Sequence, residues 1–447
     1  MELIEDCVHC GFCLPTCPTY ALWGEEMDSP RGRIYLMKMG LEGRTGMTDT
    51  YVRHFDRCLG CMACVTACPS GVQYDRLIEA ARAQIERRYR RPLPDRLFRW
   101  ALFRLFPYPR RVAVLALFVW FYQASRLRQL ARQAGIIQRI PQRLQALESL
   151  APPLSLRTLT MRMRVPAHMR AVGPARLRVG LVTGCVQRVF FPQVNLATMR
   201  VLAAEGCEVL APSSQCCCGA LALHAGREAD ALDFARRTVD LWARLDVDAV
   251  IINAAGCGSV MKEYGRLLRH DPRYAAQAEA FSARCRDVSE LLAGLEPRAP
   301  RHPLPLRVAY HDACHLQHAQ GISAEPRRLL TGIPGLELVE VPEPAICCGS
   351  AGIYNLVEPD AAQQLGERKA RNILQTGAQV VASGNPGCLL QIHSHLHRAG
   401  SSIPVVHTIQ LLDASITGVL PPAWAPRSGR VAAGWVAGGS GPATRHG

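Results

Sequence analysis

Hydrophobic and polar positions along the C-terminal part of the chain alternate between two patterns. Short β-branched runs, typical of buried strands, are followed by longer stretches with apolar residues at helical spacing. The predicted strands are "VGLVT", "AVIIN", "RVAYH" and "QVVAS", and the clearest predicted helices are Glu228 to Leu245 and Pro359 to Gln375. Strands that alternate with helices in this way indicate α/β domains built on a largely parallel sheet.

Upstream of residue 177 the pattern is mainly helical. The stretch "SPRGRIYLMKMGLEG" has apolar residues at mixed helical spacing, so we expect a helix there. Farther along, Val112 to Tyr122 form an uninterrupted apolar run, which is shorter than the roughly twenty residues of a membrane-spanning helix. The run predicts either a helix buried at a domain junction or a basic, aromatic surface that rests on a membrane or a membrane partner. A linker marked by prolines follows, with Pro152, Pro153, Pro166 and Pro174.

The C-terminal part is an internal repeat. The first half reads "LRVGLVTGC", "CCCGA" and "DAVIINAAGCG", and the second reads "LRVAYHDAC", "ICCGSAG" and "AQVVASGNPGC". Corresponding cysteines are 129, 130 and 131 residues apart, a spacing too regular for chance. They are Cys185, Cys217, Cys218 and Cys257 in the first half, and Cys314, Cys347, Cys348 and Cys388 in the second.

Within each half, two cysteines directly follow predicted strands and the Cys-Cys-Gly turn lies between them. Because parallel strands collect ligands at their carboxyl ends, we expect the four thiolates of each half to converge on one metal site. Four cysteines suit a [4Fe–4S] cluster or a structural zinc ion, and a half without metal is the third alternative. We interpret Cys207, Cys216 and Cys285 as small buried hydrophobes, although Cys216 can substitute for its neighbour.

Two denser cysteine runs lie near the N-terminus, and both have the form C-x2-C-x2-C-x3-C-P. Three thiolates at this spacing can wrap one face of a [4Fe–4S] cube, whereas the fourth ligates the other cluster in two-cluster ferredoxins. The alternatives are a pair of zinc sites or a disulfide staple, but zinc sites use two separated C-x2-C pairs. We therefore assign one cluster to Cys7, Cys10, Cys13 and Cys68, and the other to Cys58, Cys61, Cys64 and Cys17.

Length and charge narrow the class of protein. A chain of 447 residues can form about two to four domains, so its 19 cysteines do not compensate for a small core. No signal-peptide pattern precedes the first run, so we expect the reducing cytoplasm, where clustered cysteines hold metals. The formal charge is +15, yet no nucleic-acid-binding motif accompanies it, and we do not expect nucleic acid as a partner.

Several of these motifs resemble known families. The two runs with their helical insert resemble the α-helical ferredoxin domain of respiratory dehydrogenases. The Cys-Cys-Gly repeats resemble the cysteine-rich domain that heterodisulfide reductases share with anaerobic glycerol-3-phosphate dehydrogenases and with the glycolate oxidase iron–sulfur subunit. From Cys7 to about Leu412, the order of motifs, together with "SPRGRIYLMK", "RRPLPDR", "HLQHAQ" and "CCGSAGIY", is most similar to the glycolate oxidase iron–sulfur subunit.

The resemblance implies an electron-transfer subunit of a glycolate, or 2-hydroxy acid, oxidase complex. A separate FAD subunit would oxidise glycolate to glyoxylate, and this chain would carry the electrons to a quinone or membrane acceptor. We find no G-x-G-x-x-G after a strand, so we expect neither a flavin nor a catalytic residue here. The alternatives are a lactate or glycerol-3-phosphate dehydrogenase complex and a heterodisulfide reductase-like thiol catalyst.

The chain departs from heterodisulfide reductase-type domains in one respect. Those domains carry a further cysteine three residues after the last one, where this chain has Val260 and Gln391. That loss argues against a noncubane cluster and its disulfide chemistry. We expect a cytoplasmic protein, with peripheral contact to the inner face of the cytoplasmic membrane as an alternative.

The predicted fold is an α+β or α/β multidomain protein, with an α-helical ferredoxin domain followed by two repeated α/β cysteine-rich domains. The predicted boundaries are 1–90 for the ferredoxin domain, 91–176 for a basic helical bridge and linker, 177–300 and 304–423 for the repeats, and 424–447 for a disordered tail. Arg31 and Arg33 either offset cluster charge or form an ordinary solvated pair. Around Cys314 we expect hydrogen-bonding side chains, with histidine ligation as the alternative: His311, Asp312, His315 and His318.

Overall fold

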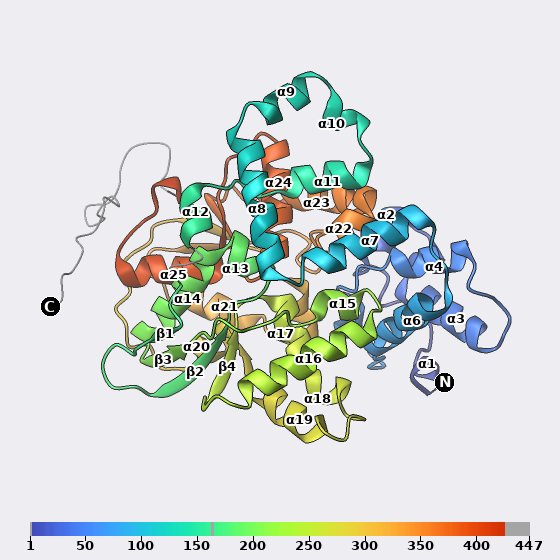
Figure 1. Ribbon diagram of the computed structural model, residues 1–447, viewed down its shortest axis with the longest axis horizontal. Helices are drawn as coiled ribbons and strands as arrows, with labels where there is room; N and C mark the ends of the chain where they lie inside the picture. Colours follow the sequence, from blue (N-terminus) through green and yellow to red (C-terminus); the bar gives the residue numbers. More distant parts are fainter. Residues whose placement is uncertain (1, 162–164, 425–447) are drawn as a thin grey trace.

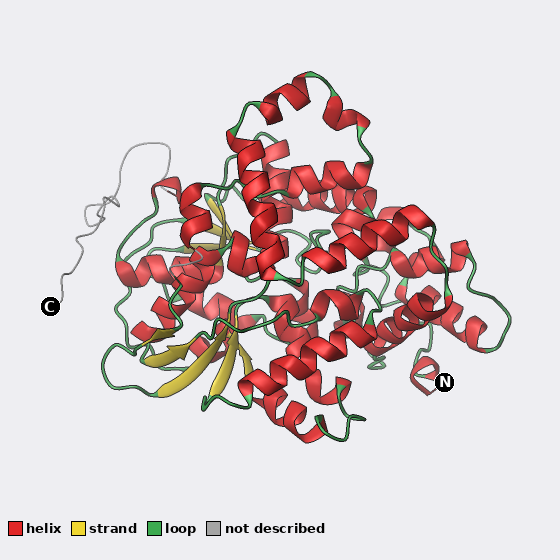
Figure 2. Ribbon diagram, in the orientation of Figure 1, coloured by secondary structure: helices red, strands yellow, loops and turns green. Residues whose placement is uncertain are grey.

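The computed structural model describes residues 2–161 and 165–424 (Figure 1). Its strands form two sheets on one side of the molecule, and the N-terminal helices lie on the opposite side (Figure 2). This arrangement confirms the predicted combination of a helical N-terminal part with two α/β domains. The domain boundaries themselves stay a prediction.

The N-terminal part is a helical domain around a small core that includes Phe55 and Ile78. The helix expected in the insert forms because Pro30 occupies its first position and the Ser29 hydroxyl accepts a hydrogen bond from the Gly32 amide. The helices of this domain are α1 (Glu2–Glu5), α2 (Pro18–Trp23), η1 (Glu26–Asp28), α3 (Pro30–Leu41), α4 (Asp49–Asp56), α5 (Ala63–Thr66) and α6 (Tyr74–Arg88).

The bridge continues as helices α7 (Leu93–Leu105), α8 (Pro109–Ala124), α9 (Leu127–Gln133), α10 (Ile136–Arg139), α11 (Gln142–Leu150) and α12 (Leu156–Met161). Helix α8 contains the apolar run and has two different faces. Val112 and Ala116 are buried against Val189 and Phe190 of the first repeat, whereas the Phe118 side chain is 68% exposed. The run is therefore buried on one face, as expected for a helix at a domain junction, and exposed on the other, and contact of that exposed face with a membrane stays a prediction. Among the described helices, none is long and apolar enough to cross a membrane.

The first repeat has a five-stranded sheet in the order β1-β3-β2-β4-β5, parallel except for β1. Strand β1 comes from the predicted linker, which thus extends the sheet by an antiparallel edge. The strands are β1 (His168–Met169), β2 (Leu177–Val182), β3 (Cys207–Leu210), β4 (Ala249–Ile252) and β5 (Cys285–Asp287). The helices are α13 (Val186–Phe190), α14 (Pro192–Ala204), α15 (Ala220–His224), α16 (Glu228–Trp242), α17 (Ala255–Met261), α18 (Tyr264–Leu267), α19 (Ala275–Arg284) and α20 (Val288–Gly294).

The second repeat has a four-stranded parallel sheet in the corresponding order, β7-β6-β8-β9. Its strands are β6 (Arg307–Tyr310), β7 (Glu337–Glu340), β8 (Val380–Ser383) and β9 (Val405–His407). Its helices are η3 (His315–Ala319, a π-helix), α21 (Ala324–Thr331), α22 (Tyr354–Val357), α23 (Pro359–Gln375), α24 (Pro386–Arg398), α25 (Thr408–Thr417) and η4 (Pro422–Trp424). All four strands and both helices predicted from the pattern of the repeats are present.

The two repeats pack against each other through equivalent elements, because α14 contacts α25 and α20 contacts α21. The loops after β4 and β8 also meet, where the Ala255 amide donates to the Gly384 carbonyl at 3.2 Å. The carboxyl ends of the two central strands therefore face each other. The predicted tail lies outside the described residues except for Trp424, which is buried in the shared core and so belongs to the fold.

Candidate metal centres

The first ferredoxin site is a cavity of about 20 Å³ whose cysteines are Cys7, Cys10, Cys13 and Cys68. The structure thus brings together the crossed set expected from the spacing. The loop is tight, since Gly11 has a φ of +89° and a Cβ there would lie 2.8 Å from the Arg31 guanidinium. Arg31 also donates to the His9 carbonyl at 2.9 Å and pairs with Glu26. This site lies at the surface, because Cys10 is exposed.

The second ferredoxin site is a similar cavity of about 20 Å³ whose cysteines are Cys17, Cys58, Cys61 and Cys64. All four are buried. Burial raises the pKa of Cys61 and of Cys64 well above the usual thiol range, because a thiolate is poorly solvated there. These sulfurs therefore become thiolates only if a cation compensates them, as the iron of a cluster does. The all-thiolate donor set fits a [4Fe–4S] cluster.

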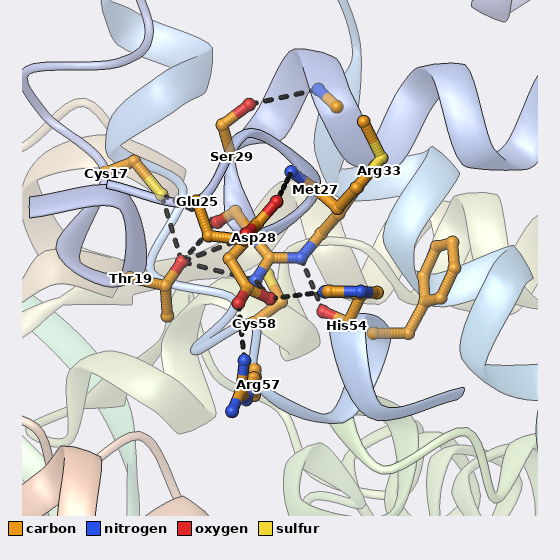
Figure 3. Close-up of polar contacts among 12 residues, drawn as sticks. Cys17, Thr19, Glu25, Met27, Asp28, Ser29, Arg33, His54, Arg57 and Cys58 are labelled. Carbon is orange, nitrogen blue, oxygen red and sulfur yellow. Dashed lines mark hydrogen bonds and ion pairs between the residues drawn. The ribbon is translucent and has the colours of Figure 1, made fainter. Parts of the chain in front are cut away.

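A buried ion-pair network supports this second site (Figure 3). Asp28 is fully buried and faces three groups: the Arg33 guanidinium, His54 Nδ1 at 2.9 Å and the Arg57 guanidinium at 2.7 Å. The Thr19 hydroxyl accepts from Arg33 at 3.2 Å and lies 3.2 Å from Cys17 Sγ. Because the Arg33 side chain is only 1% exposed, it is part of the site and not a solvated residue.

Two arginines act on Cys58 directly. Burial disfavours its thiolate, but the charges of Arg33 and Arg82 outweigh that effect and lower the pKa of Cys58. Arg82 also donates to the Cys58 carbonyl and, at 2.8 Å, to the His224 carbonyl of the first repeat. The same side chain thus ties the second ferredoxin site to the cysteine-rich part of the molecule.

The second ferredoxin loop packs into the second repeat. Leu59 and Cys61 belong to the same hydrophobic core as Cys347, Cys348 and Cys388. Polar contacts fix the same interface, with Thr66 Oγ1 lying 2.7 Å from His318 Nδ1 and the Tyr354 hydroxyl donating to the Arg57 carbonyl at 3.0 Å. A site in the ferredoxin domain and a site in the second repeat are therefore neighbours, although some 250 residues of chain separate Thr66 from His318.

The cysteines of the first repeat form a continuous set of sulfur contacts. Cys185 Sγ lies 3.7 Å from Cys217 Sγ, and Cys218 is within hydrogen-bonding reach of both Cys217 and Cys257. In contrast, the Cys216 thiol contacts Thr238 Oγ1 at 3.5 Å, and Cys216 does not line the cavity shared by the other four. The quartet expected from the repeat is assembled without Cys216.

The cysteines of the second repeat are connected in the same way, from Cys314 to Cys347, Cys348 and Cys388. The predicted neighbours of Cys314 have different roles. Asp312 pairs with Arg327 at 2.6 Å. The Nδ1 of His315 lies 4.0 Å from Cys314 Sγ, and His318 bonds Thr66. His311 lies beside Cys348 and Cys388.

Both quartets line one cavity of about 610 Å³. Apolar side chains of the bridge form another part of its wall, among them Phe98, Leu102, Leu115 and Leu144 from α7, α8 and α11. Two histidines stack between the quartets, His224 of the first repeat on His315 of the second, with ring centroids 4.8 Å apart. Sequence patterns could not reveal this cavity, because its wall combines three separate parts of the chain.

The remaining cysteines are structural. Cys207 and Cys285 are fully buried in strands β3 and β5, and burial raises the pKa of Cys207 to about 11 and that of Cys285 to about 12. All nineteen cysteines are free, so the structure contains none of the disulfides of the alternative interpretation. Lys369 is a residue of the site region that sequence reasoning missed. It is buried beside Cys347 and Cys348, and its one sequence signal is the scarcity of lysine in this chain.

Comparisons with known proteins agree with this architecture. A family model described as "4Fe-4S dicluster domain" matches residues 3–72, and one described as "Cysteine-rich domain" matches residues 179–262 and 308–393. A third, described as "Glycolate oxidase iron-sulfur subunit, linker region", matches residues 94–151.

Three curated relatives cover the chain to different extents. The probable glycolate oxidase iron-sulfur subunit of Bacillus subtilis is 38% identical over 92% of this chain and 93% of its own length. The glycolate oxidase iron-sulfur subunit of Escherichia coli is 36% identical over 93% of this chain and 95% of its own length. The lactate utilization protein A of Exiguobacterium sp. is 30% identical over 53% of this chain and 98% of its own length. The chain belongs to the family of glycolate oxidase iron–sulfur subunits.

Proposed function

We propose that this chain conducts electrons from a separate FAD subunit, which oxidises glycolate to glyoxylate, to a quinone or membrane acceptor. The observation that carries the proposal is the shared core of the second ferredoxin loop and the second repeat, which joins Cys61 to Cys347 and Cys348. A [4Fe–4S] cluster supplies one-electron chemistry when bound. What the protein contributes is the order of the sites and the polarity around each one.

The order of the sites suggests a direction. The first ferredoxin loop is exposed, and it presents Val8 and Phe12 to solvent. Large exposed apolar side chains around a redox site are typical of a contact with a partner protein. We therefore assign this loop to the FAD subunit. The second ferredoxin site is buried and adjoins the repeats, so it follows the first in the path.

The cavity between the repeats supports the assignment of an apolar acceptor. A quinone takes up two electrons and two protons to become a quinol, which matches the two electrons and two protons released when glycolate becomes glyoxylate. A largely apolar cavity with few polar groups is the usual site for such a ring. The bridge residues Phe98, Leu102 and Leu115 provide apolar wall in the same cavity that the cysteine quartets line.

The bridge also supports a peripheral position at the inner face of the cytoplasmic membrane. The outer face of α8 exposes Val114, Leu117, Phe118 and Phe121, and Arg110 and Arg111 lie at the start of the same helix. Exposed aromatic residues beside arginines are typical of surfaces that bind anionic lipid. This face belongs to the same helix as Leu115 of the cavity wall, which would bring a lipid-soluble acceptor close to its site.

A heterodisulfide reductase-like thiol catalyst is less well supported. The positions where such domains carry a further cysteine hold Val260 and Gln391, and both are buried. The Gln391 amide donates to the Ala362 carbonyl at 2.9 Å, so this side chain stabilises helix packing. Lactate or glycerol 3-phosphate as the substrate of the flavin subunit stays the alternative for the complex, because no feature of the described residues selects among them.

The proposal is tested with Cys61→Ser in the purified complex, assayed with vesicles that contain a quinone. Glycolate-dependent quinone reduction should be lost, whereas reduction of a soluble dye at the flavin subunit should persist, because the substitution interrupts only the path beyond the flavin. Glycolate, lactate and glycerol 3-phosphate are compared as substrates. Sedimentation of the wild-type chain with the same vesicles tests the membrane position.

The matched control is Cys285→Ser, which removes a fully buried thiol outside every cysteine quartet. It should retain iron and quinone reduction. Unchanged quinone reduction in Cys61→Ser would refute the proposed path. If the complex oxidised lactate in preference to glycolate, the proposed electron path would stand, and lactate would be the substrate of the flavin subunit.

A further inference from the structure

The second quartet has a histidine beside it that the first quartet lacks. A ring nitrogen of His311 and the Sγ atoms of Cys348 and Cys388 all lie within 4.8 Å of one another. Within residues 2–161 and 165–424, no other three histidine, cysteine or acidic side chains bring their ligand atoms so close together. The equivalent position of the first repeat, three residues before its first cysteine, is Val182, which has no ligand atom.

The fold places His311 at this point. It directly follows strand β6, and its backbone amide donates to the Ala382 carbonyl of strand β8 at 2.9 Å. Cys388 lies in the first turn of α24, which follows β8. Because β6 and β8 are neighbouring parallel strands, both side chains emerge at the same sheet edge. The geometry is thus built by the sheet and does not depend on a loose loop.

One ring nitrogen of His311 has no hydrogen-bond partner among the described residues. The residue is 2% exposed, and the nitrogen without a partner is its buried Nδ1 atom. A buried polar nitrogen without a partner forfeits its hydration and gains nothing in return, so such atoms are rare unless a ligand satisfies them. His315 and His318 each have one ring nitrogen in contact with another side chain, Cys314 and Thr66 respectively, while their Nε2 atoms are also buried without a partner. Neither of them belongs to the close group of His311, Cys348 and Cys388.

We propose that His311 is a ligand of the metal group held by the second repeat, so that this centre combines imidazole and thiolate ligands while the first repeat offers thiolates alone. The inference rests on the proposed metal occupancy of the Cys314, Cys347, Cys348 and Cys388 quartet. Imidazole and thiolate together suit either an iron–sulfur cluster or a zinc ion. Because either centre takes four protein ligands, His311 would take the place of one of the four thiolates. For a cluster, replacing an anionic thiolate by a neutral imidazole would raise the reduction potential, as in Rieske centres.

The test is spectroscopic and uses the full chain, purified without oxygen from cells supplied with ¹⁵N-histidine. Iron and zinc are counted first. For an iron centre, pulsed EPR of the reduced protein should show a directly coordinated histidine nitrogen. For zinc, X-ray absorption should show a nitrogen at about 2.0–2.1 Å beside sulfur at about 2.3 Å. His311→Gln should lose the nitrogen contribution and, for iron, shift the midpoint potential of that centre to a lower value.

The matched control is His315→Gln, which removes a histidine next to Cys314 and should retain the nitrogen contribution. A metal in the second repeat without a coordinated histidine nitrogen would overturn the inference and leave the proposed electron path intact. Absence of any metal from the second repeat would overturn the inference together with the occupancy on which it rests. The wild-type spectra decide between these outcomes even if His311→Gln does not fold.

Discussion

The two repeats share a scaffold and differ in what surrounds it. Each has four cysteines in the same order, the same arrangement of parallel strands and a Cys-Cys-Gly turn. The second quartet adjoins His311 and shares a hydrophobic core with Leu59 and Cys61 of the ferredoxin domain. The first repeat meets the ferredoxin domain through α15 and α6 instead, where Arg82 donates to the His224 carbonyl, and it contacts α8 through α13. This difference shows that the ligand set alone does not define the role of a site. The residues around the cysteines determine the charge near the site and the parts of the molecule that it contacts.

A buried lysine extends this difference. Gly219 faces Ala231 and Gly349 faces Ala362 across corresponding helices, which makes Thr238 of α16 the counterpart of Lys369 in α23. The Lys369 ammonium donates to the Glu343 carbonyl at 2.9 Å, and the charges of Cys347 and Cys348 act on it. Burial nevertheless lowers the pKa of Lys369. The second site therefore has a cation beside its thiolates, whereas Thr238 offers only a hydroxyl.

Removing one cysteine from each quartet should give the largest effect and tests whether the two sites have different roles. Even loss of a group that only supports a ligand lowers metal affinity by roughly 10–100-fold, so Cys218→Ser and Cys348→Ser should each empty their own site. We expect Cys348→Ser to reduce quinone reduction more, because its site adjoins the second ferredoxin loop. Metal content and quinone reduction by the assembled complex measure both effects.

Cys207→Ser is the control for these variants, since it removes a fully buried thiol in strand β3 that lies in neither quartet. Equal losses of quinone reduction in Cys218→Ser and Cys348→Ser would mean that the two repeats act as one unit. A larger loss in Cys218→Ser would reverse the proposed order of the sites.

The glycines of the two turns allow a comparison of backbone constraint. Gly219 and Gly349 have φ values of +79° and +89°, where a side chain is strained by roughly 1–3 kcal/mol. A Cβ at Gly349 would also lie 2.7 Å from the Ala362 carbonyl oxygen, against 3.1 Å from that of Ala231 at Gly219. We expect Gly349→Ala to destabilise its repeat more than Gly219→Ala. Hydrogen exchange of α23 and α16 measures the two local opening free energies.

Gly294→Ala serves as the reference for the glycine pair, because a Cβ there would meet nothing within 4 Å and its backbone does not require a positive φ. It should leave exchange in both helices unchanged. If Gly219→Ala proved as costly as Gly349→Ala, the closer carbonyl contact in the second turn would have no energetic consequence.

Local sequence patterns predicted much of this molecule. The crossed sets, Cys7 to Cys68 and Cys17 to Cys64, could be inferred because cluster ligands follow a short, regular spacing. The repeat quartets could be inferred because parallel strands collect their carboxyl ends at one edge. The common cavity could not, since it depends on how the bridge packs over both repeats. For His311, the pattern showed a histidine near Cys314 but not that β6 aims it at Cys388.

Other differences between the structure and the predictions from sequence follow from tertiary packing. Arg33 lies in a sequence that suits a solvated helix start, and only the burial of Asp28 beneath it shows its role. Trp424 begins a stretch rich in small residues, yet its ring fills the core shared by the repeats. The predicted linker supplies strand β1, because the edge of β3 leaves its backbone groups available for an antiparallel partner.

The last comparison concerns the caps of equivalent helices, whose effects on stability nearly cancel in the wild type. Asp287 accepts from the Ser289 amide at the start of α20, and His407 accepts from the Ile409 amide at the start of α25. Burial raises the pKa of Asp287 to about 6 and lowers that of His407 to about 4. Each of these changes in pKa corresponds to roughly 3 kcal/mol, but the two act in opposite directions.

Between about pH 4 and 6, the folded protein binds more protons at Asp287 than the unfolded chain does, so this residue lowers the unfolding free energy as pH rises. Between about pH 4 and 6.5, the unfolded chain binds more protons at His407 than the folded protein does, so this residue raises the unfolding free energy as pH rises. The two contributions should nearly cancel in the wild type. Relative to the wild type, Asp287→Asn should become more stable as pH rises, and His407→Asn should become less stable. Chemical denaturation over this pH range measures both changes in unfolding free energy. Equal pH profiles for both variants would show that the caps of the two repeats do not differ in protonation.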